Sequence, residues 1–162
     1  MKKNYLFAAS ILTATFLLNG CNNNINDAKP SLAKQKITGL KTPESVVQAK
    51  DRRIFISEIG EFGKDGDGQI SVVNTSGKVS VFASGLDDPK GLKIIGNNLY
   101  IADKTKIIKA SLNDSKTSVF VPTNDFPATP QFFFFFLADL QRNLYVSDSG
   151  DPMDPVTCGA IY

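Results

Sequence analysis

The sequence has neither histidine nor tryptophan among its 162 residues, and the missing histidine is the more informative absence. Without histidine the chain cannot build a Ser-His-Asp or Cys-His catalytic arrangement, a histidine-ligated zinc site or a histidine general base. Any chemistry must use carboxylates, amides, hydroxyls, lysine amines or a hard cation such as Ca²⁺ held by oxygen ligands.

Cysteine is also scarce, and the charge of the chain is balanced. Cys21 and Cys158 are the two cysteines, so no disulfide framework is predicted. Residues 1–20 hold two lysines and no acidic residue, and their removal leaves 16 basic and 16 acidic side chains. A neutral chain gives no electrostatic reason to expect nucleic acid or an anionic membrane surface as a partner.

The first 21 residues have the pattern of a secreted lipoprotein. Lys2 and Lys3 precede an apolar stretch at residues 6–18, which is shorter than the roughly 20 residues of a membrane-spanning helix. Residues 18–21, Leu-Asn-Gly-Cys, resemble the lipobox of bacterial lipoproteins, in which the signal is cut before a cysteine that receives lipid. A plain signal peptide with an incidental cysteine is the alternative.

Three segments follow from this pattern. Residues 1–20 are predicted to be the lipoprotein signal peptide, and residues 21–40 a lipid anchor at Cys21 with a flexible tether, because this stretch is rich in asparagine and lacks periodicity. Residues 41–162 are predicted to be the folded domain. The protein is expected in the bacterial cell envelope, anchored through lipid to the outer membrane and facing the periplasm.

A tetrapeptide repeated three times organises the folded domain. Residues 55–58, 100–103 and 145–148 each read aromatic, β-branched, small, acidic, and consecutive copies are 45 residues apart. Val47, Leu92 and Leu137 also stand 45 apart, which predicts that they are equivalent positions. A period in the forties made of short strands is typical of propeller blades, small twisted sheets that stack to bury their faces.

The predicted fold is therefore all-β, a partial β-propeller of about two and a half four-stranded blades. Propellers close with roughly four to eight blades, so the sequence is interpreted as a truncated form of a longer protein, with association of copies as the alternative. The predicted strand pairs are 46–49 with 54–58, 92–95 with 99–103, and 136–138 with 144–148. Residues 159–161 are expected to open a third strand in the last blade.

Five consecutive phenylalanines at residues 132–136 interrupt the pattern. Strict alternation would send these rings to both faces, which suits a strand buried on both sides. The spacing from Pro130 to Leu137 is four residues longer than that from Pro89 to Leu92, which indicates an insertion in blade three. An inner strand that presents aromatic rings to a pocket is one interpretation, and a local sequence irregularity is the preferred one.

Several motifs resemble the gluconolactonase and senescence-marker (regucalcin-like) family and, more broadly, six-bladed NHL-repeat and strictosidine-synthase-like propellers. They are residues 43–46, 64–68, 99–103 and 144–149. The resemblance implies a six-bladed propeller that hydrolyses lactones with one divalent cation held at blade entries by Glu, Asn and Asp. Glu44 matches the first ligand, but Lys90 stands before Gly91-Leu92 where the family pattern has Asn.

The acidic residues that end the repeated tetrapeptides are further candidates. Glu58, Asp103 and Asp148 should approach the same rim as Glu44, because the second strand of a blade ends where the first begins. One interpretation is an acidic rim that attracts a cation, Ca²⁺ or another divalent ion, or a polyol. The alternative is that the acids hydrogen-bond the backbone of the following turn.

Asp65 and Asp67, in the sequence Asp-Gly-Asp-Gly-Gln-Ile at residues 65–70, resemble the middle of a Ca²⁺ loop. Aligned on an EF-hand, the first and twelfth ligand positions fall on Gly63 and Asn74, where Asp and Glu are needed. The stretch is equally a glycine-rich loop between strands.

Two functions remain. The first is a ligand-binding or scaffold propeller displayed by the lipid anchor, with a lactone or sugar-like molecule or a protein as partner. The second is a metal-dependent, gluconolactonase-type hydrolase in the full-length form. Lys90 in a ligand position and the absence of histidine favour the binding function and predict that this chain by itself is inactive.

Overall fold

The structure is a computed structural model that describes residues 36–151, 153–154 and 156–162, of which residues 37–162 belong to one compact unit. The predicted signal peptide, Cys21 and most of the predicted tether lie outside the described residues. The described part is all-β, with one short 3-10 turn, η1 (Thr123–Asp125). It contains no helix of the length and hydropathy needed to cross a membrane.

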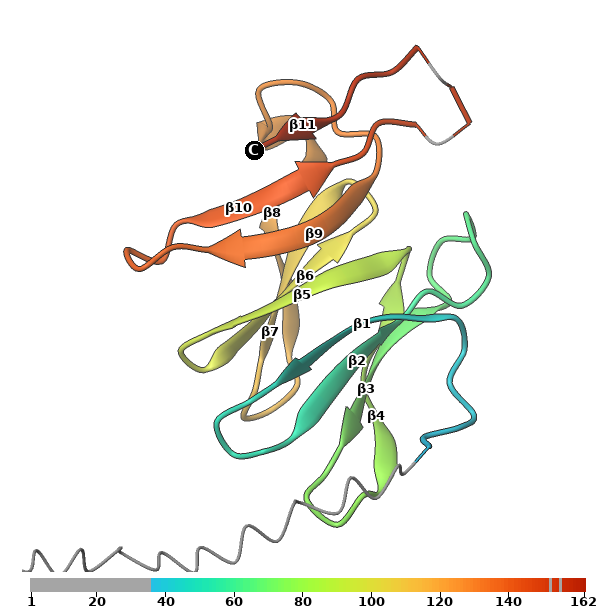
Figure 1. Cartoon of the computed structure of the whole chain (residues 1–162), viewed down its shortest axis with the longest axis vertical. Helices are drawn as coiled ribbons and strands as arrows, with labels where there is room; N and C mark the ends of the chain where they lie inside the picture. Colours follow the sequence, from blue (N-terminus) through green and yellow to red (C-terminus); the bar gives the residue numbers. More distant parts are fainter. Residues whose placement is uncertain (1–35, 152, 155) are drawn as a thin grey trace, which may run out of the picture. The chain divides into compact units, whose positions relative to one another are not determined.

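Three antiparallel sheets follow one another along the chain (Figure 1). Blade 1 contains β1 (Pro43–Gln48), β2 (Ile54–Glu58), β3 (Gly68–Val73) and β4 (Val79–Leu86). Blade 2 contains β5 (Pro89–Ile95), β6 (Asn98–Asp103), β7 (Lys106–Ser111) and β8 (Thr117–Val121). Blade 3 contains β9 (Phe133–Ala138), β10 (Leu144–Asp148) and the two-residue β11 (Ala160–Ile161).

The strand pairs predicted from the sequence are confirmed. β1 pairs with β2, β5 with β6 and β9 with β10, each as an antiparallel hairpin. The repeated tetrapeptides lie in β2, β6 and β10, the second strand of each blade. β11 pairs with β10 through Ser147 and Asp148, so residues 160–161 do open a third strand. The described domain is a partial propeller.

The first strands of the blades lie next to one another. β1 contacts β5, and β5 contacts β9, so these strands form the row of inner strands that Figure 1 shows from bottom to top. The approach is closest at Gly91 in β5. A Cβ atom there would lie 2.7 Å from the carbonyl oxygen of Phe134 and 3.1 Å from the Cα of Phe135. Only glycine lets the two inner strands come this near.

Apolar side chains fill the spaces between successive blades. The core between blades 1 and 2 is made mainly of aliphatic residues around the edge-to-face pair of Phe55 and Phe82, whose ring centroids are 4.8 Å apart. The core between blades 2 and 3 is smaller and more aromatic, with Phe133 and Phe136 buried against Ala102, Ile107 and Val146. Burial of one such side chain contributes about 1.5–3 kcal/mol.

The pairing of the first strands differs by one residue from the pairing that the 45-residue spacing of the sequence predicts. Val46, Leu92 and Phe136 pair with the equivalent residues Ile56, Ile101 and Val146. Val46, Leu92 and Phe136 are therefore the equivalent positions, and the equivalence predicted for Val47, Leu92 and Leu137 is wrong. The reason is turn length, because five residues separate the paired Gln48 and Ile54, whereas four separate the equivalent pair Ile94 and Leu99.

The extra residues predicted in blade 3 lie before its first strand rather than within it. Phe133 pairs with Asp148 just as Pro89 pairs with Asp103, so each first strand has the same length up to its first regular pair. The additional residues lie in the connection 122–132, which contains η1 and carries Phe126 onto Phe133 at a centroid distance of 4.9 Å.

A bulge divides the phenylalanine run between two environments. Phe133 and Phe136 are buried in the core, whereas Phe134 and Phe135 lie in the irregular step of β9 and are 45% and 61% exposed. The bulge breaks the alternation of side chains. β9 is therefore not a strand buried on both faces.

Candidate functional site

The three acids that end the second strands are buried. Glu58, Asp103 and Asp148 are 1%, 0% and 5% exposed. A buried carboxylate is costly unless hydrogen bonds replace its water. The structure shows which groups replace that water.

Asp103 and Asp148 both accept hydrogen bonds from the backbone that leads into their own blade. Asp103 Oδ1 accepts from the N–H groups of Asp87 and Asp88 at 2.9 and 3.1 Å. Asp148 Oδ2 and Oδ1 accept from the N–H groups of Gln131 and Phe132 at 2.9 and 2.8 Å. In each blade these donors are the two residues immediately before the first strand.

Glu58 makes the corresponding contact in blade 1. Its Oε2 accepts from the N–H of Lys41, two residues before β1, and its Oε1 accepts from the side-chain amide of Gln69 at 3.1 Å. These carboxylates thus accept hydrogen bonds from backbone N–H groups, which agrees with the second interpretation of the repeated acids. The backbone concerned is mainly the entry of the same blade rather than the following turn, although Asp148 also accepts from the N–H of Gly150.

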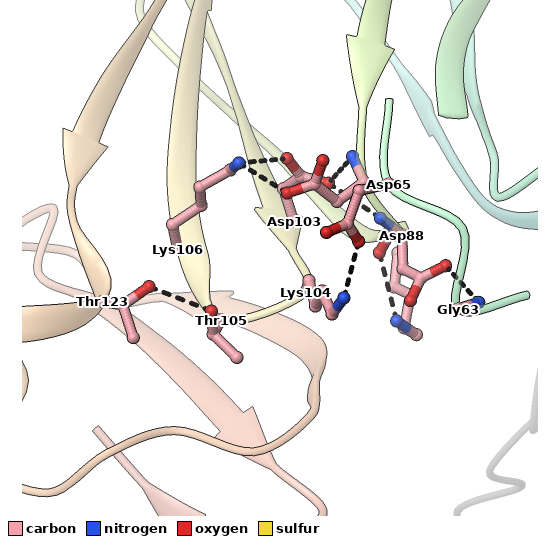
Figure 2. A network of polar contacts seen from close by, with 10 residues as sticks. Gly63, Asp65, Asp88, Asp103, Lys104, Thr105, Lys106 and Thr123 are labelled. Atoms are coloured by element: carbon pink, nitrogen blue, oxygen red, sulfur yellow. Dashed lines mark hydrogen bonds and ion pairs between the residues drawn. The ribbon is translucent and has the colours of Figure 1, made fainter. Parts of the chain in front are cut away.

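Asp103 belongs to a network of charges at the start of blade 2 (Figure 2). Lys106 points at its carboxylate, with Nζ 3.6 Å from Asp103 Oδ2 and 2.7 Å from Asp87 Oδ2. Within the described residues Asp103 Oδ2 is buried without a hydrogen-bond partner. Burial raises the pKa of Asp103 to about 6, while Lys106 opposes this rise and Asp87 adds to it.

The loop between β2 and β3 is held against blade 2 by two contacts that Figure 2 also shows. Lys104 Nζ lies 2.6 Å from Asp65 Oδ1, and Asp88 Oδ1 accepts from the N–H of Gly63 at 3.2 Å. The hydrogen bond to Asp65 raises the pKa of Lys104, while burial opposes the rise. On the other side of Lys104, Thr105 contacts Thr123 of η1 at 2.9 Å.

The two loop aspartates are directed to different partners. Asp65 pairs with Lys104, whereas Asp67 Oδ2 accepts from the N–H of Glu61 at 3.1 Å and lies 3.8 Å from Lys64 Nζ. Across the described residues, no three side chains of the His, Cys, Asp and Glu types gather closely enough to hold a metal ion. The structure therefore does not bring Asp65, Asp67, Glu44 or the strand-end acids together as one ligand set.

The bulges of the first strands place three unlike side chains at equivalent positions. In each hairpin, two residues of the first strand face one small residue of the repeat, namely Ser57, Ala102 or Ser147. The first residue of each bulge is Glu44, Lys90 or Phe134, and we call these the blade-entry positions. They carry a carboxylate, an ammonium and a phenyl ring.

Lys90 is the most unusual of the three, because it is 1% exposed. Its Nζ donates to the carbonyl oxygen of Asp88 at 3.1 Å and lies 3.8 Å from the ring centroid of Phe132. The ring of Phe62 follows at 5.7 Å from Nζ and contacts Phe132 at the same centroid distance. Burial lowers the pKa of Lys90, and the negative charges of Asp88, Asp103 and Glu44 oppose this effect.

A concave surface lies at the other ends of the inner strands. A groove of about 450 Å³ is lined by the β1–β2 and β5–β6 turns and by Leu112 and Asn113. Arg53 fixes one wall, because it pairs with Asp51 at 2.8 Å and donates to the carbonyl oxygen of Leu112 at 3.0 Å. The guanidinium group of Arg53 is thus already bound within the protein.

Comparison with solved structures gives a relative for this arrangement. The crystal structure of a protein described as a "putative gluconolactonase" matches with a TM-score of 0.54 and 18% sequence identity over 78% of this chain. The two chains share a fold. The match spans 50% of that protein, so the present chain covers about half its length. No protein-family model and no curated protein matches the sequence.

The blade-entry positions of this propeller do not fit the divalent cation that the family resemblance implies. Ca²⁺ takes six to eight oxygen ligands, whereas these positions offer one carboxylate, one ammonium and one phenyl ring. The Glu44 carboxylate already accepts from the Ser45 hydroxyl. A buried ammonium beside it repels a cation by an amount on the order of a kcal/mol or more at an effective dielectric near 20.

Sequence reasoning identified Lys90 as a departure from the family pattern but missed its burial and its aromatic neighbours. Phe62 and Phe132 lie 28 and 42 residues from Lys90 in the chain. Asp87 and Asp88 were missed as well. The available signal was their position, because they are the two residues immediately before a first strand, as Gln131 and Phe132 are. That position can be recognised only when the pairing register of the strands is known.

Proposed function

We propose that residues 41–162 form a ligand-binding propeller segment whose blade-entry end takes a small polar molecule, a lactone or sugar-like compound. The supporting observation is the set of unlike groups at Glu44, Lys90 and Phe134, which the equivalent bulges place on adjacent strands. A carboxylate orients hydroxyl groups, and an exposed phenyl ring packs against the apolar face of a sugar-like ring.

The proposal is tested by calorimetric titration of the full chain in detergent with an aldonolactone and with the corresponding open-chain aldonate. Phe134→Ala and Glu44→Gln should each weaken binding about tenfold or more. Val81→Ala is the matched control, because Val81 is exposed on β4, the outer strand of blade 1. Binding that is unchanged in both entry variants would refute this function.

Metal-dependent lactone hydrolysis is the second candidate, and the likeness to a "putative gluconolactonase" favours it. Glu44 matches the first acidic ligand of the family pattern, so this function would depend on its carboxylate. Hydrolysis assays with and without Ca²⁺ or Zn²⁺ decide between the candidates. Metal-dependent hydrolysis by this chain that disappears in Glu44→Gln would establish the enzyme function.

The proposed location is the bacterial cell envelope, with a lipid at Cys21 that holds the domain on the periplasmic side of the outer membrane. The short apolar segment followed by Leu-Asn-Gly-Cys supports it. More than one acyl chain gives stable anchoring. Mass spectrometry of the membrane fraction should find acylated Cys21, and Cys21→Ser should release the protein or block its processing. Unmodified Cys21 in soluble mature protein would contradict the proposal.

A further inference from the structure

We infer that the ammonium group of Lys90 is the resident cation of the blade-entry end, so that the chain fills with its own side chain the place where a metal ion is implied. The pocket around this group is then selective for a primary ammonium over a divalent metal ion. The inference does not depend on which small molecule binds beside it.

Lys90 is enclosed mainly by aromatic rings rather than by oxygen atoms. The whole residue is 1% exposed, yet its Nζ has one direct oxygen partner, the carbonyl of Asp88 at 3.1 Å. The ring of Phe132 lies only 3.8 Å from Nζ, and Phe62 contributes a second ring farther out. Aromatic faces attract an ammonium, and the attraction is stronger where water is excluded.

The carboxylates near Lys90 bind other groups of the protein. Asp88 Oδ1 accepts from the N–H of Gly63, and Asp103 Oδ1 accepts from two backbone N–H groups. Asp103 Oδ2 makes no hydrogen bond within the described residues and lies 3.6 Å from the ammonium of Lys106. The charges of Asp88 and Asp103 favour the protonated lysine through space, together with that of Glu44. They therefore neutralise a cation at this position without offering the shared oxygen shell that Ca²⁺ needs.

The experiment exploits the shape of the missing side chain. Lys90→Ala removes three methylene groups and the ammonium, which n-propylammonium replaces, while 1-propanol is its neutral counterpart of similar size. The melting temperature of the full chain in detergent is followed against each compound and against Ca²⁺. Lys93→Ala is the control, because Lys93 lies on the same strand but is partly exposed.

Propylammonium should raise the melting temperature of Lys90→Ala saturably, at about tenfold lower concentration than 1-propanol, and should not affect the wild type or Lys93→Ala. A tenfold ratio corresponds to about 1.4 kcal/mol. Equal effects of the amine and the alcohol would show that the side chain is only an apolar filler. Stabilisation by Ca²⁺ but not by the amine would show a metal site. Either result overturns the inference.

Lys90→Met gives a second test if Lys90→Ala does not fold. Methionine keeps most of the length and removes the charge. The variant should melt below the wild type and should gain no Ca²⁺ binding detectable by calorimetry. A Lys90→Met protein that is as stable as the wild type, or one that binds Ca²⁺, contradicts the inference. Loss of lactone or aldonate binding alone would bear on the proposed function and not on this cation.

Discussion

Asp103 and Asp148 make the same pair of backbone contacts in successive blades, since each carboxylate accepts the N–H groups of the two residues that precede its own first strand. Glu58 is one methylene longer and binds one such N–H, that of Lys41, together with the amide of Gln69. The acid of the repeat is thus a structural element of each blade.

The first prediction concerns Asp148, which accepts from three backbone N–H groups at 2.8 to 3.0 Å. Asp148→Ala leaves these donors without their acceptor and should lower the free energy of unfolding by about 2–4 kcal/mol. Urea unfolding followed by circular dichroism measures the change. Asp125→Ala, at an exposed position in η1, should change it by less than about 0.5 kcal/mol. Equal effects of the two substitutions would contradict the assigned role.

The second prediction is a pH dependence that comes from Asp103. Its pKa in the folded protein is about 6, above the usual aspartate value of 3.8. The folded state therefore holds a proton that the unfolded state releases, and the stability contributed by this group falls as the pH rises from about 4 to 6. The fall should be on the order of 1–3 kcal/mol.

Urea unfolding at pH 4.5 and pH 7 tests this pH dependence. Asp103→Asn should remove the loss of stability that Asp103 causes between pH 4.5 and pH 7. Lys106→Met should extend the loss of stability to higher pH, because the ammonium of Lys106 lowers the pKa of Asp103 in the wild type. A wild-type profile parallel to that of Asp103→Asn would contradict the prediction.

The third prediction concerns the close approach of β5 and β9 at Gly91. An added Cβ would lie 2.7 Å from the carbonyl oxygen of Phe134, so Gly91→Ala must push the inner strands apart. Such overpacking typically costs about 1–3 kcal/mol. Ser45 is the equivalent bulge residue of β1 and already carries a Cβ, which makes Ser45→Ala the control. If Gly91→Ala is no more destabilising than the control, the strands do not meet as described.

The fourth prediction concerns the ion pair between Lys104 and Asp65, which holds the β2–β3 loop. Both side chains are partly exposed, at 36% and 63%, so the coupling energy from a double-mutant cycle should be below about 1 kcal/mol. Hydrogen exchange of the loop amides should nevertheless quicken in Lys104→Met, because one of the polar contacts between the loop and blade 2 is lost. A coupling of several kcal/mol, or unchanged exchange, would contradict this view.

The sequence predicted the fold because the repeated tetrapeptide recurs in the second strand of each blade. It also predicted that acids end the second strands. Their partners could not be predicted, because the donors are backbone groups whose position depends on the connection between blades. Two residues separate β4 from β5, whereas residues 122–132 separate β8 from β9.

The phenylalanine run shows a different limit. A run of identical residues contains no alternation, so the bulge that buries Phe133 and exposes Phe134 leaves no trace in the sequence. The burial of Lys90 was hidden for a similar reason, since lysine is rarely buried and its aromatic neighbours come from other blades.

The contacts between each strand-end acid and its own blade entry span only 15 to 17 residues of chain. No blade relies on its neighbour to complete them. A unit of this kind can be copied or deleted in a gene as a whole, and each copy brings its own means of neutralising its buried carboxylate. The acid thus belongs to each blade as a self-contained unit, and it recurs in strands whose blade-entry positions carry glutamate, lysine and phenylalanine.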